Sequence, residues 1–413
     1  MRATRSGNPR VTPFSDTPGV AVGDASIEPL VGFTVGVTAD RRRDELSTLL
    51  QRRGARVIEA PTIRIAPLED DLELHAATRR CLTAPVDYAV ATTGVGWRGW
   101  MAAADGFGLG EPLRDALSRA VVISRGPKAT GAVRACGLRE AFSPDSEAND
   151  GLLAWLLERE LAGRRVVVQE HGAPLPEFVT GLRERGAEVI PVPVYRWLPA
   201  LDLVPVARLV DAVLRREVDA VTFTSAPAAA NFLAVAADSV RTAEPARGVE
   251  PARGVEPARG AEMREAFGGG VLPACIGPVC ARPLLDAAIP AVWPDRGRLG
   301  KLVQLVVEHL SRRGRLAFHA RGVPIVVQGN AVVASGTAIL LPPAPAAVLR
   351  ALAAEPGRVL SRRELLRRAW YQPGAVAEHT VDASVGRLRA ALGDLAWLVG
   401  TVNKRGYRIE VDQ

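Results

Sequence analysis

The chain has 413 residues, 48% hydrophobic and 23% charged, which is typical of a globular protein with room for about three domains. No run approaches the roughly 18 apolar residues of a membrane span, and the N-terminus lacks the apolar core of a secretion signal. The four cysteines form no C-x-x-C pair and have no histidine at ligand spacing, which favours reduced thiols over disulfides or zinc. We therefore expect a cytoplasmic protein with no membrane partner, no metal and no cofactor.

The net charge of +7 is unevenly distributed along the sequence. Residues 311–413 contain 15 Lys and Arg against 7 Asp and Glu, a net of +8, whereas the rest of the chain is close to neutral. An excess of positive charge confined to one segment indicates attraction to phosphate, although a solvated basic face without a partner has the same composition.

Short β-branched runs alternate with amphipathic helices from Val31 onward. Residues 1–29 have no periodicity and are predicted to be a flexible leader. The expected strands are VGFTVGVTA, ARVIEAPT, DYAVATT, AVVISRG, RRVVVQE, EVIPVPVY, DAVTFTS and LPACIG. This alternation predicts an α/β fold with parallel sheets covered by helices on both faces.

A weak internal repeat divides this α/β region. DYAVATTGVGWRGWMAAA resembles DAVTFTSAPAAANFLAVAA, and a later Gly-Pro turn opens a helix in both halves. The spacing differs mainly by a triplicated EPARGV-like segment, residues 244–261, which we predict to be a disordered insert. Without this insert the sequence predicts two similar doubly wound lobes.

Turns that follow the predicted strands are candidate ligand-binding segments, because each precedes a helix whose free backbone N–H groups favour anions. Every doubly wound protein has such turns, so they predict a cleft without naming its ligand. His171 lies in one of them, where we favour a hydrogen-bonded turn residue over a substrate contact.

The order of TTGVGWRGW, SRGPKATGAVRACGL, VPVYRW, FTSAPAAANFL and CIGPVCARPLLDAAI resembles the uroporphyrinogen-III synthases over residues 31–310. The resemblance implies one domain over residues 30–310, with lobe one made of residues 31–65 and 198–310 and lobe two of residues 66–197. It also implies a hydro-lyase activity that cyclises hydroxymethylbilane, a linear octacarboxylate, with inversion of the last pyrrole ring.

The resemblance assigns roles to specific residues. Tyr195 matches the family's recurrent tyrosine and is the candidate catalytic acid, although an aromatic that packs the linker explains it equally well. The expected substrate-binding residues are Thr38, Arg41, Thr93, Gly94, Arg125, Gly126, Lys128, Thr130, Ser225, Gly277 and Cys280. The family's usual Gly-Pro-Thr-Thr-Ala turn is Gly277-Pro278-Val279-Cys280-Ala281 here, so two hydroxyls are missing.

The C-terminal segment, residues 320–413, resembles the OmpR/PhoB-type winged helix. PGRVLSRRELLRRAW, EHTVDASVGRLRAALGD and TVNKRGYRI follow the family's order of second helix, recognition helix and wing. Ser361 and Glu364 form an S-x-x-E capping box, which predicts a helix start at Ser361. Val381, Val385, Leu388 and Leu392 recur at helical spacing and predict one buried stripe.

The face opposite this stripe is expected to enter the DNA major groove. Arg387 is the candidate for a bidentate guanine contact, and the wing supplies basic residues for phosphate. The predicted DNA-binding residues are Trp370, His379, Thr380, Ala383, Ser384, Arg387, Arg389, Lys404, Arg405 and Arg408. No phosphorelay receiver pattern precedes this segment.

Three functions remain open from the sequence. The first is a transcriptional regulator whose synthase-like region senses a tetrapyrrole or another anionic small molecule; such a fusion resembles actinobacterial regulators of nitrate and nitrite assimilation. The second is an active uroporphyrinogen-III synthase that also binds DNA. The third is a regulator in which the synthase-like region serves as a dimerisation scaffold. The expected partners are double-stranded DNA, the anionic ligand, and a second copy of the chain or another regulator.

Overall fold

The computed structural model describes residues 27–67, 72–170, 172, 174–238, 256–370 and 377–412. The chain divides into two compact units, Met1–Thr38 with Arg42–Ala60 and Pro205–Gln413, and Ala39–Arg41 with Pro61–Val204. Most of the predicted leader, including residues 1–26, lies outside the described residues. Among the described residues, every helix is too short or too polar to cross a membrane.

The strands that build the sheets have the following bounds. They are β1 Thr34–Val37, β2 Arg56–Glu59, β3 Ile63–Pro67, β4 Tyr88–Ala91, β5 Val121–Ser124, β6 Glu140–Phe142, β7 Arg165–Gln169, β8 Glu188–Val192, β9 Tyr195–Pro199, β10 Ala220–Phe223, β11 Leu272–Cys275, β12 Arg315–Ala320, β13 Val323–Gln328, β14 Ala331–Ala334, β15 Thr337–Leu340, β16 Val399–Val402 and β17 Gly406–Ile409.

The helices alternate with these strands through most of the chain. They are α1 Arg43–Gln51, α2 Leu72–Cys81, α3 Gly94–Gly106, α4 Gly110–Ser118, α5 Pro127–Ala135, α6 Asn149–Leu157, α7 Pro176–Glu184, α8 Val204–Leu214, α9 Ala226–Asp238, α10 Glu256–Gly268, α11 Pro278–Asp286, α12 Leu299–Arg313, α13 Pro343–Ala353, α14 Arg362–Ala369 and α15 His379–Leu392.

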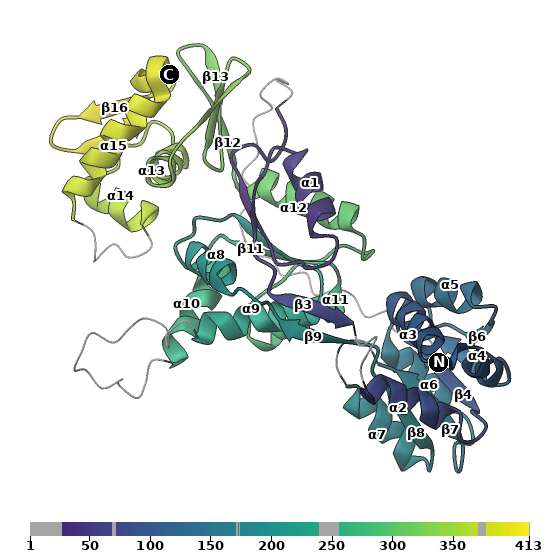
Figure 1. The fold of residues 1–413 in the computed structure, drawn as a ribbon. Helices are drawn as coiled ribbons and strands as arrows, with labels where there is room; N and C mark the ends of the chain where they lie inside the picture. The colour runs from purple at the N-terminus through teal and green to yellow at the C-terminus, as the bar shows by residue number, and fades with distance from the viewer. Residues whose placement is uncertain are drawn as a thin grey trace, which may run out of the picture. The chain divides into compact units, whose positions relative to one another are not determined.

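Lobe two, in the second unit, is a parallel sheet in the order β6-β5-β4-β7-β8. Successive residues of β4 point to opposite faces, so Ala89 and Ala91 join the core with α2 to α5, whereas Val90 joins α6 and α7. The helices on both faces explain why the strands are apolar throughout (Figure 1).

A separate ladder pairs β3 with β9. The lobe boundaries predicted at residues 65/66 and 197/198 fall inside this ladder.

Lobe one, in the first unit, is a parallel sheet in the order β11-β10-β1-β2. Helices α8 to α11 pack on one face, where Val221 and Phe223 of β10 join their core. Helices α1 and α12 contact each other and the sheet from the other side (Figure 1). The α/β fold with two doubly wound lobes is therefore confirmed.

The two sheets share a strand order, which explains the internal repeat. The series β5-β4-β7-β8 in lobe two matches β11-β10-β1-β2 in lobe one, and β4 and β10 begin directly after Asp87 and Asp219. The pair β7–β8 comes last in the sheet of lobe two, whereas its counterpart β1–β2 opens lobe one, so the lobes are related by a circular permutation. This permutation is why only the β4–β5 and β10–β11 halves matched in the linear sequence.

The C-terminal module contains a four-stranded antiparallel sheet, helices α13 to α15 and the β16–β17 hairpin (Figure 1). Val381, Val385, Leu388 and Leu392 are all buried in its core, as the helical spacing predicts. Ser361 caps α14, and both hydrogen bonds of its capping box with Glu364 are present. The winged-helix fold is therefore confirmed.

Two predicted boundaries are wrong. Helix α12 continues to Arg313 and β12 starts at Arg315, so the C-terminal module begins before residue 320 and only Gly314 separates it from lobe one. The predicted insert is too long, because its residues 256–261 form the first turns of α10. Residues 239–255 lie outside the described residues.

Candidate functional site

The carboxyl edge of the lobe-two sheet brings several predicted ligand residues together. Thr93 follows β4 and caps α3, where its side chain accepts a hydrogen bond from the Gly96 N–H at 3.2 Å. Gly94 must be glycine here, because a Cβ would lie 2.1 Å from the backbone carbonyl oxygen of Lys128. The N-termini of α3 and α5 therefore lie against each other at this edge, and both favour negative charge.

Gln169, at the end of β7, fixes this arrangement. Its side-chain oxygen accepts hydrogen bonds from the backbone N–H groups of Thr92 and Thr93, both at 3.1 Å. Its amide nitrogen donates to Thr93 Oγ1 at 3.1 Å and to the Glu170 carbonyl at 2.8 Å. Gln169 is completely buried, so all these groups are satisfied away from water.

Tyr195, at the start of β9, is buried beside this network. Burial raises the pKa of its hydroxyl, while a hydrogen bond with Thr93 and the positive charges of Arg125 and Arg41 act to lower that pKa. The phenol is therefore protonated at neutral pH and can donate a hydrogen bond or a proton. Its ring also packs edge-on against Trp197, with the ring centroids 6.3 Å apart. This placement fits both expectations for Tyr195, a catalytic acid and an aromatic residue that packs the linker.

Arg125 provides a partly buried cation at the same edge. Burial lowers the pKa of its guanidinium, whereas Tyr195 and Glu147 act to raise it. Its backbone N–H continues the β4–β5 ladder by donating to the Ala91 carbonyl at 2.9 Å. A cation withdrawn from water interacts more strongly with a carboxylate than an exposed one does.

The remaining predicted ligand residues of lobe two lie on the turn that opens α5. Gly126 is the N-cap residue of α5 and is buried against Glu147. Lys128 is exposed, and the Thr130 hydroxyl is hydrogen-bonded to Ser124 at 2.7 Å. Arg41, which belongs to the same unit, is exposed. His171 lies outside the described residues.

Lobe one corrects two of the predicted ligand residues. Thr38 is completely buried and donates to the Thr222 carbonyl at 2.9 Å, so its hydroxyl is used between strands. Cys280 is buried in the core, hydrogen-bonded to Cys275, and faces away from solvent. Gly277 precedes α11 and Ser225 precedes α9, as expected of turn residues.

The predicted site residues did not include Gln169, Glu147 or Glu170, although the turn from Glu170 was one of the candidate ligand segments. Burial raises the pKa of the Glu170 carboxyl, which a backbone hydrogen bond from Leu175 opposes. The sequence did contain a signal for Gln169 and Glu170: the polar segment QEHG directly follows the apolar strand RRVVV, at the end where ligand residues are expected.

The exposed face of α15 carries most of the predicted DNA contacts. His379, Ala383 and Arg387 are exposed, and Thr380 is partly exposed. Ser384 is instead completely buried, so its prediction as a DNA contact is wrong. It follows Val381 by one helical turn and therefore lies beside the buried stripe.

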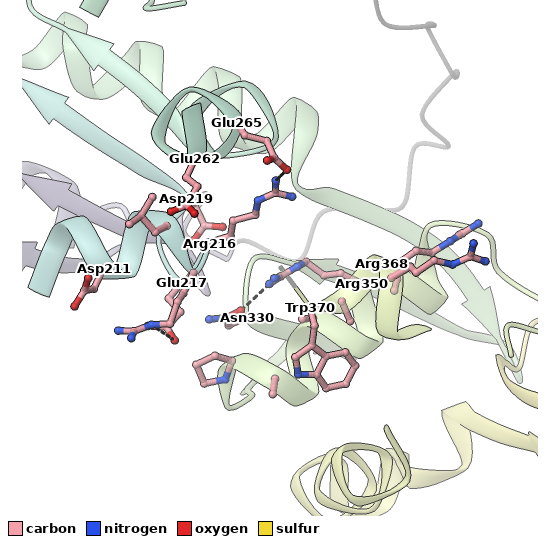
Figure 2. Close-up of a pocket in the computed structure, with 18 of the residues that line it drawn as sticks. Asp211, Arg216, Glu217, Asp219, Glu262, Glu265, Asn330, Arg350, Arg368 and Trp370 are labelled. Atoms are coloured by element: carbon pink, nitrogen blue, oxygen red, sulfur yellow. Dashed lines mark hydrogen bonds and ion pairs between the residues drawn. The ribbon is translucent and has the colours of Figure 1, made fainter. Parts of the chain in front are cut away.

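The wing places further basic residues near the same module. Lys404 and Arg405 are exposed in the β16–β17 turn. Arg389 donates to the Val399 carbonyl and to Thr401, and Arg408 pairs with Glu410, so both are held by the hairpin. Trp370 follows α14 and lines a pocket that residues of lobe one also line (Figure 2).

Two contacts that the sequence did not reveal fix the recognition helix. Asp382 of α15 accepts hydrogen bonds from the Tyr407 hydroxyl of the wing at 2.5 Å and from Arg362 of α14 at 2.8 Å. These bonds hold the Asp382 pKa below its usual value, with the tyrosine bond as the largest cause. The three elements that define a winged helix are thus tied together at one carboxylate.

The fold and these two sites define a class of protein in which a bilobed α/β domain precedes a winged-helix DNA-binding domain. The chain belongs to the uroporphyrinogen-III synthase HemD family, whose model matches residues 44–304. Residues 336–409 match the family of the C-terminal domain of transcriptional regulatory proteins.

Individual relatives agree with this assignment. The chain is 26% identical over 280 residues to the uncharacterised protein YjjA of Bacillus subtilis, which covers 66% of this chain and 94% of that protein. A crystal structure of a mutant uroporphyrinogen III synthase from Thermus thermophilus is 28% identical, covers 68% of this chain and all of that chain, and superposes with a TM-score of 0.53. The phosphate regulon transcriptional regulatory protein PhoB of Rhizobium meliloti is 40% identical over 74 residues, 17% of this chain and 33% of that protein.

Proposed function

We propose that the protein is a DNA-binding transcriptional regulator whose HemD-family domain binds a tetrapyrrole-related or other anionic ligand. The observation that carries the proposal is the pairing of two separate surfaces on one chain. One is the exposed face of the recognition helix with Arg387, followed by the basic wing turn at Lys404 and Arg405. The other is the anion-favouring sheet edge with Arg125 and Tyr195.

The DNA-binding half of the proposal rests on charge and exposure. The net charge of +8 over residues 311–413 is available to phosphate because Lys404, Arg405 and Arg387 are exposed. Displacement of counterions from phosphate makes such binding dependent on salt. Two winged helices on paired half-sites would bind more strongly than one, so we infer that a homodimer or a second regulator takes part.

The ligand-binding half rests on lobe two. A polycarboxylate needs backbone N–H donors and a few cations, and the edge that carries Thr93, Arg125 and the N-terminus of α5 offers both. The resemblance to regulators of nitrate and nitrite assimilation suggests target genes of that kind, because sirohaem for nitrite reductase derives from uroporphyrinogen III.

An active synthase that also binds DNA is the second candidate function. The buried, protonated Tyr195 beside a cation favours it, because that hydroxyl can assist departure of the substrate hydroxyl as an acid. The turn that contains Val279 and Cys280 argues against synthase activity, because the two hydroxyl side chains usual in the family are absent there and Cys280 is buried.

Two assays with the full chain test these functions. In the first, retention on duplex oligonucleotides is measured at increasing salt, and we expect a steep decrease with log salt. Replacing both Lys404 and Arg405 by alanine should reduce that slope by about two. Salt-insensitive or absent retention would refute the regulator.

In the second, hydroxymethylbilane is incubated with the protein and the type III product is compared with the spontaneous type I product. Type III product above background supports the synthase, and its absence leaves a ligand-binding domain. Titration calorimetry with uroporphyrin, a stable octacarboxylate, then decides whether tetrapyrroles bind.

A further inference from the structure

Asp87 and Asp219 occupy equivalent positions in the two lobes but differ in the charges around them. Asp87 precedes β4 and accepts the backbone N–H of Arg165, at the start of β7, at 2.8 Å. Its charge is balanced within lobe two by Arg164, whose Nη1 lies 2.8 Å from Asp87 Oδ1. In this lobe the aspartate is a local structural feature.

Asp219 precedes β10 and accepts the backbone N–H of Thr34, at the start of β1, at 2.7 Å. The positive charge of Arg350, in α13 of the winged helix, favours its ionised form without a direct ion pair between the two side chains. Burial disfavours the charged form of both groups, and each charge favours ionisation of the other. Asp87 thus has an arginine partner at ion-pair distance, whereas Arg350 acts on Asp219 without a direct ion pair.

Arg350 is also tied to the β13–β14 turn of its own module. Its Nη1 donates to the Gly329 carbonyl at 2.8 Å and to Asn330 Oδ1 at 2.6 Å (Figure 2). This turn rests on the segment of lobe one that leads into β1. The Asn330 N–H donates to the Gly32 carbonyl at 2.7 Å, and Gln328 Nε2 donates to the Val31 carbonyl at 2.9 Å.

Gly32 and Gly329 allow this close contact between two backbones. Both have positive φ values, +85° and +53°. A Cβ on Gly32 would lie 2.5 Å from the Gln328 carbonyl oxygen, and one on Gly329 would lie 2.4 Å from the Gly32 carbonyl oxygen. We call Asp219, Arg350 and the paired segments 31–33 and 328–330 the junction.

The junction is flanked by a pocket of about 1120 Å³, so the two modules are not packed tightly beside it. Glu262 of lobe one and Arg367 and Trp370 of the winged helix line this pocket. Because the pocket leaves these side chains apart, loss of one contact at the junction should shift the balance between docked and undocked modules. Trp370, a predicted phosphate contact, faces lobe one across this pocket.

We propose that the junction docks the winged helix on lobe one and restrains its binding to DNA, which rests on the proposed function as a regulator. Strands β1 and β10 both begin at the junction, and the predicted ligand residue Ser225 follows the end of β10. A ligand that shifts β10 therefore has a short physical route to the junction. Helix α13, which carries Arg350, packs in the same core as α14 and α15.

The test uses the full chain with Arg350→Met and Asp219→Asn, and Arg164→Met as the matched control in lobe two. Hydrogen exchange of peptides that contain Asn330 reports docking directly. We expect exchange at least tenfold faster in Arg350→Met, which removes the hydrogen bonds to Gly329 and Asn330, a smaller increase in Asp219→Asn, and no change in the control. Unchanged exchange in Arg350→Met would contradict the proposal, because this variant lacks the bonds that hold the turn at Asn330.

Affinity for duplex DNA is measured on the same proteins. We expect the two single variants to bind three- to tenfold more tightly than the wild type, and Gly32→Ala, which separates the backbones sterically, to do the same. Unchanged exchange and unchanged affinity in all three would overturn the junction as a restraint while leaving the regulator intact. If the wild type binds no DNA, the proposed function fails, and the exchange data alone still decide whether the junction docks the modules.

Discussion

The Tyr407 hydroxyl in the wing donates a 2.5 Å hydrogen bond to Asp382 in the recognition helix. Arg362 of α14 donates to the same carboxylate, and its guanidinium lies over the Tyr407 ring, 5.5 Å from the centroid. One carboxylate of the recognition helix is therefore bonded by two other elements, in addition to the buried apolar stripe that packs the helix in its module.

Replacing Tyr407 by Phe should remove this hydrogen bond while keeping the buried ring. Because the acceptor is charged but the Asp382 side chain is 43% exposed to solvent, we expect a loss of about 1 kcal/mol in the free energy of unfolding. Urea unfolding measures this loss. A stability equal to that of the wild type would show that the bond contributes nothing net.

Asp382 should make the stability of the winged helix depend on pH in the acidic range. Its pKa in the folded protein is lowered, so its contribution is fully present above the unfolded carboxyl pKa of about 4 and is lost as the pH falls through the lower folded value. The stability difference between wild type and Asp382→Asn should therefore shrink from pH 5 towards pH 2. A constant difference across that range, measured by urea unfolding, would contradict the lowered pKa.

Arg387→Ala should weaken specific DNA binding by about 1–3 kcal/mol and relax discrimination at one base pair. Arg387 is exposed on the α15 face, where a guanidinium can reach the guanine edge. Affinities for the operator and for random DNA measure the effect. Arg282→Ala, which removes an exposed arginine of lobe one paired with Asp286, is the control and should change neither. Equal losses on both DNAs would assign Arg387 to phosphate instead.

Arg125→Met should weaken uroporphyrin binding about 10- to 100-fold, because a hydrogen bond to a charged group typically contributes about 1.5–3 kcal/mol. The matched control is Arg134→Met, which removes an exposed arginine of the same lobe that pairs with Glu140. Calorimetry on both variants separates a specific contact from a general loss of positive charge. Similar weakening in the two would argue against a site at Arg125.

Gln169→Leu should destabilise lobe two by about 2–5 kcal/mol, because it leaves the backbone N–H groups of Thr92 and Thr93 buried without their acceptor. Thermal unfolding measures the loss. Gln304→Leu on the exposed side of α12 is the control and should be close to neutral. A neutral Gln169→Leu would mean that another group accepts these two bonds.

The sequence predicted the parts of the fold that local periodicity controls. The apolar strands between amphipathic helices identified parallel sheets, and the Ser361–Glu364 box placed the start of α14. The sequence predicted less well which residues are exposed when they lie at the end of a strand or beside the apolar stripe of a helix. Ser384 and Thr38 were assigned to exposed positions, but packing against neighbouring elements buries both.

Contacts between distant segments were not accessible in the same way. Gln169 reaches Thr92 and Thr93 across 77 and 76 residues, and Tyr407 reaches Asp382 across 25. The composition of these segments does not show that they pair, because hydrogen-bond partners depend on which distant segments the folded chain brings together.

The sequence by itself determined the class of each module, because helix and strand periods, caps and basic charge are local properties that hold before the chain folds. Only the tertiary structure decided that the turn at Gln328 to Asn330 of the winged helix lies against Val31 and Gly32 of lobe one. That contact depends on the close approach of the Gly32 and Gly329 backbones, between segments about 297 residues apart in the sequence.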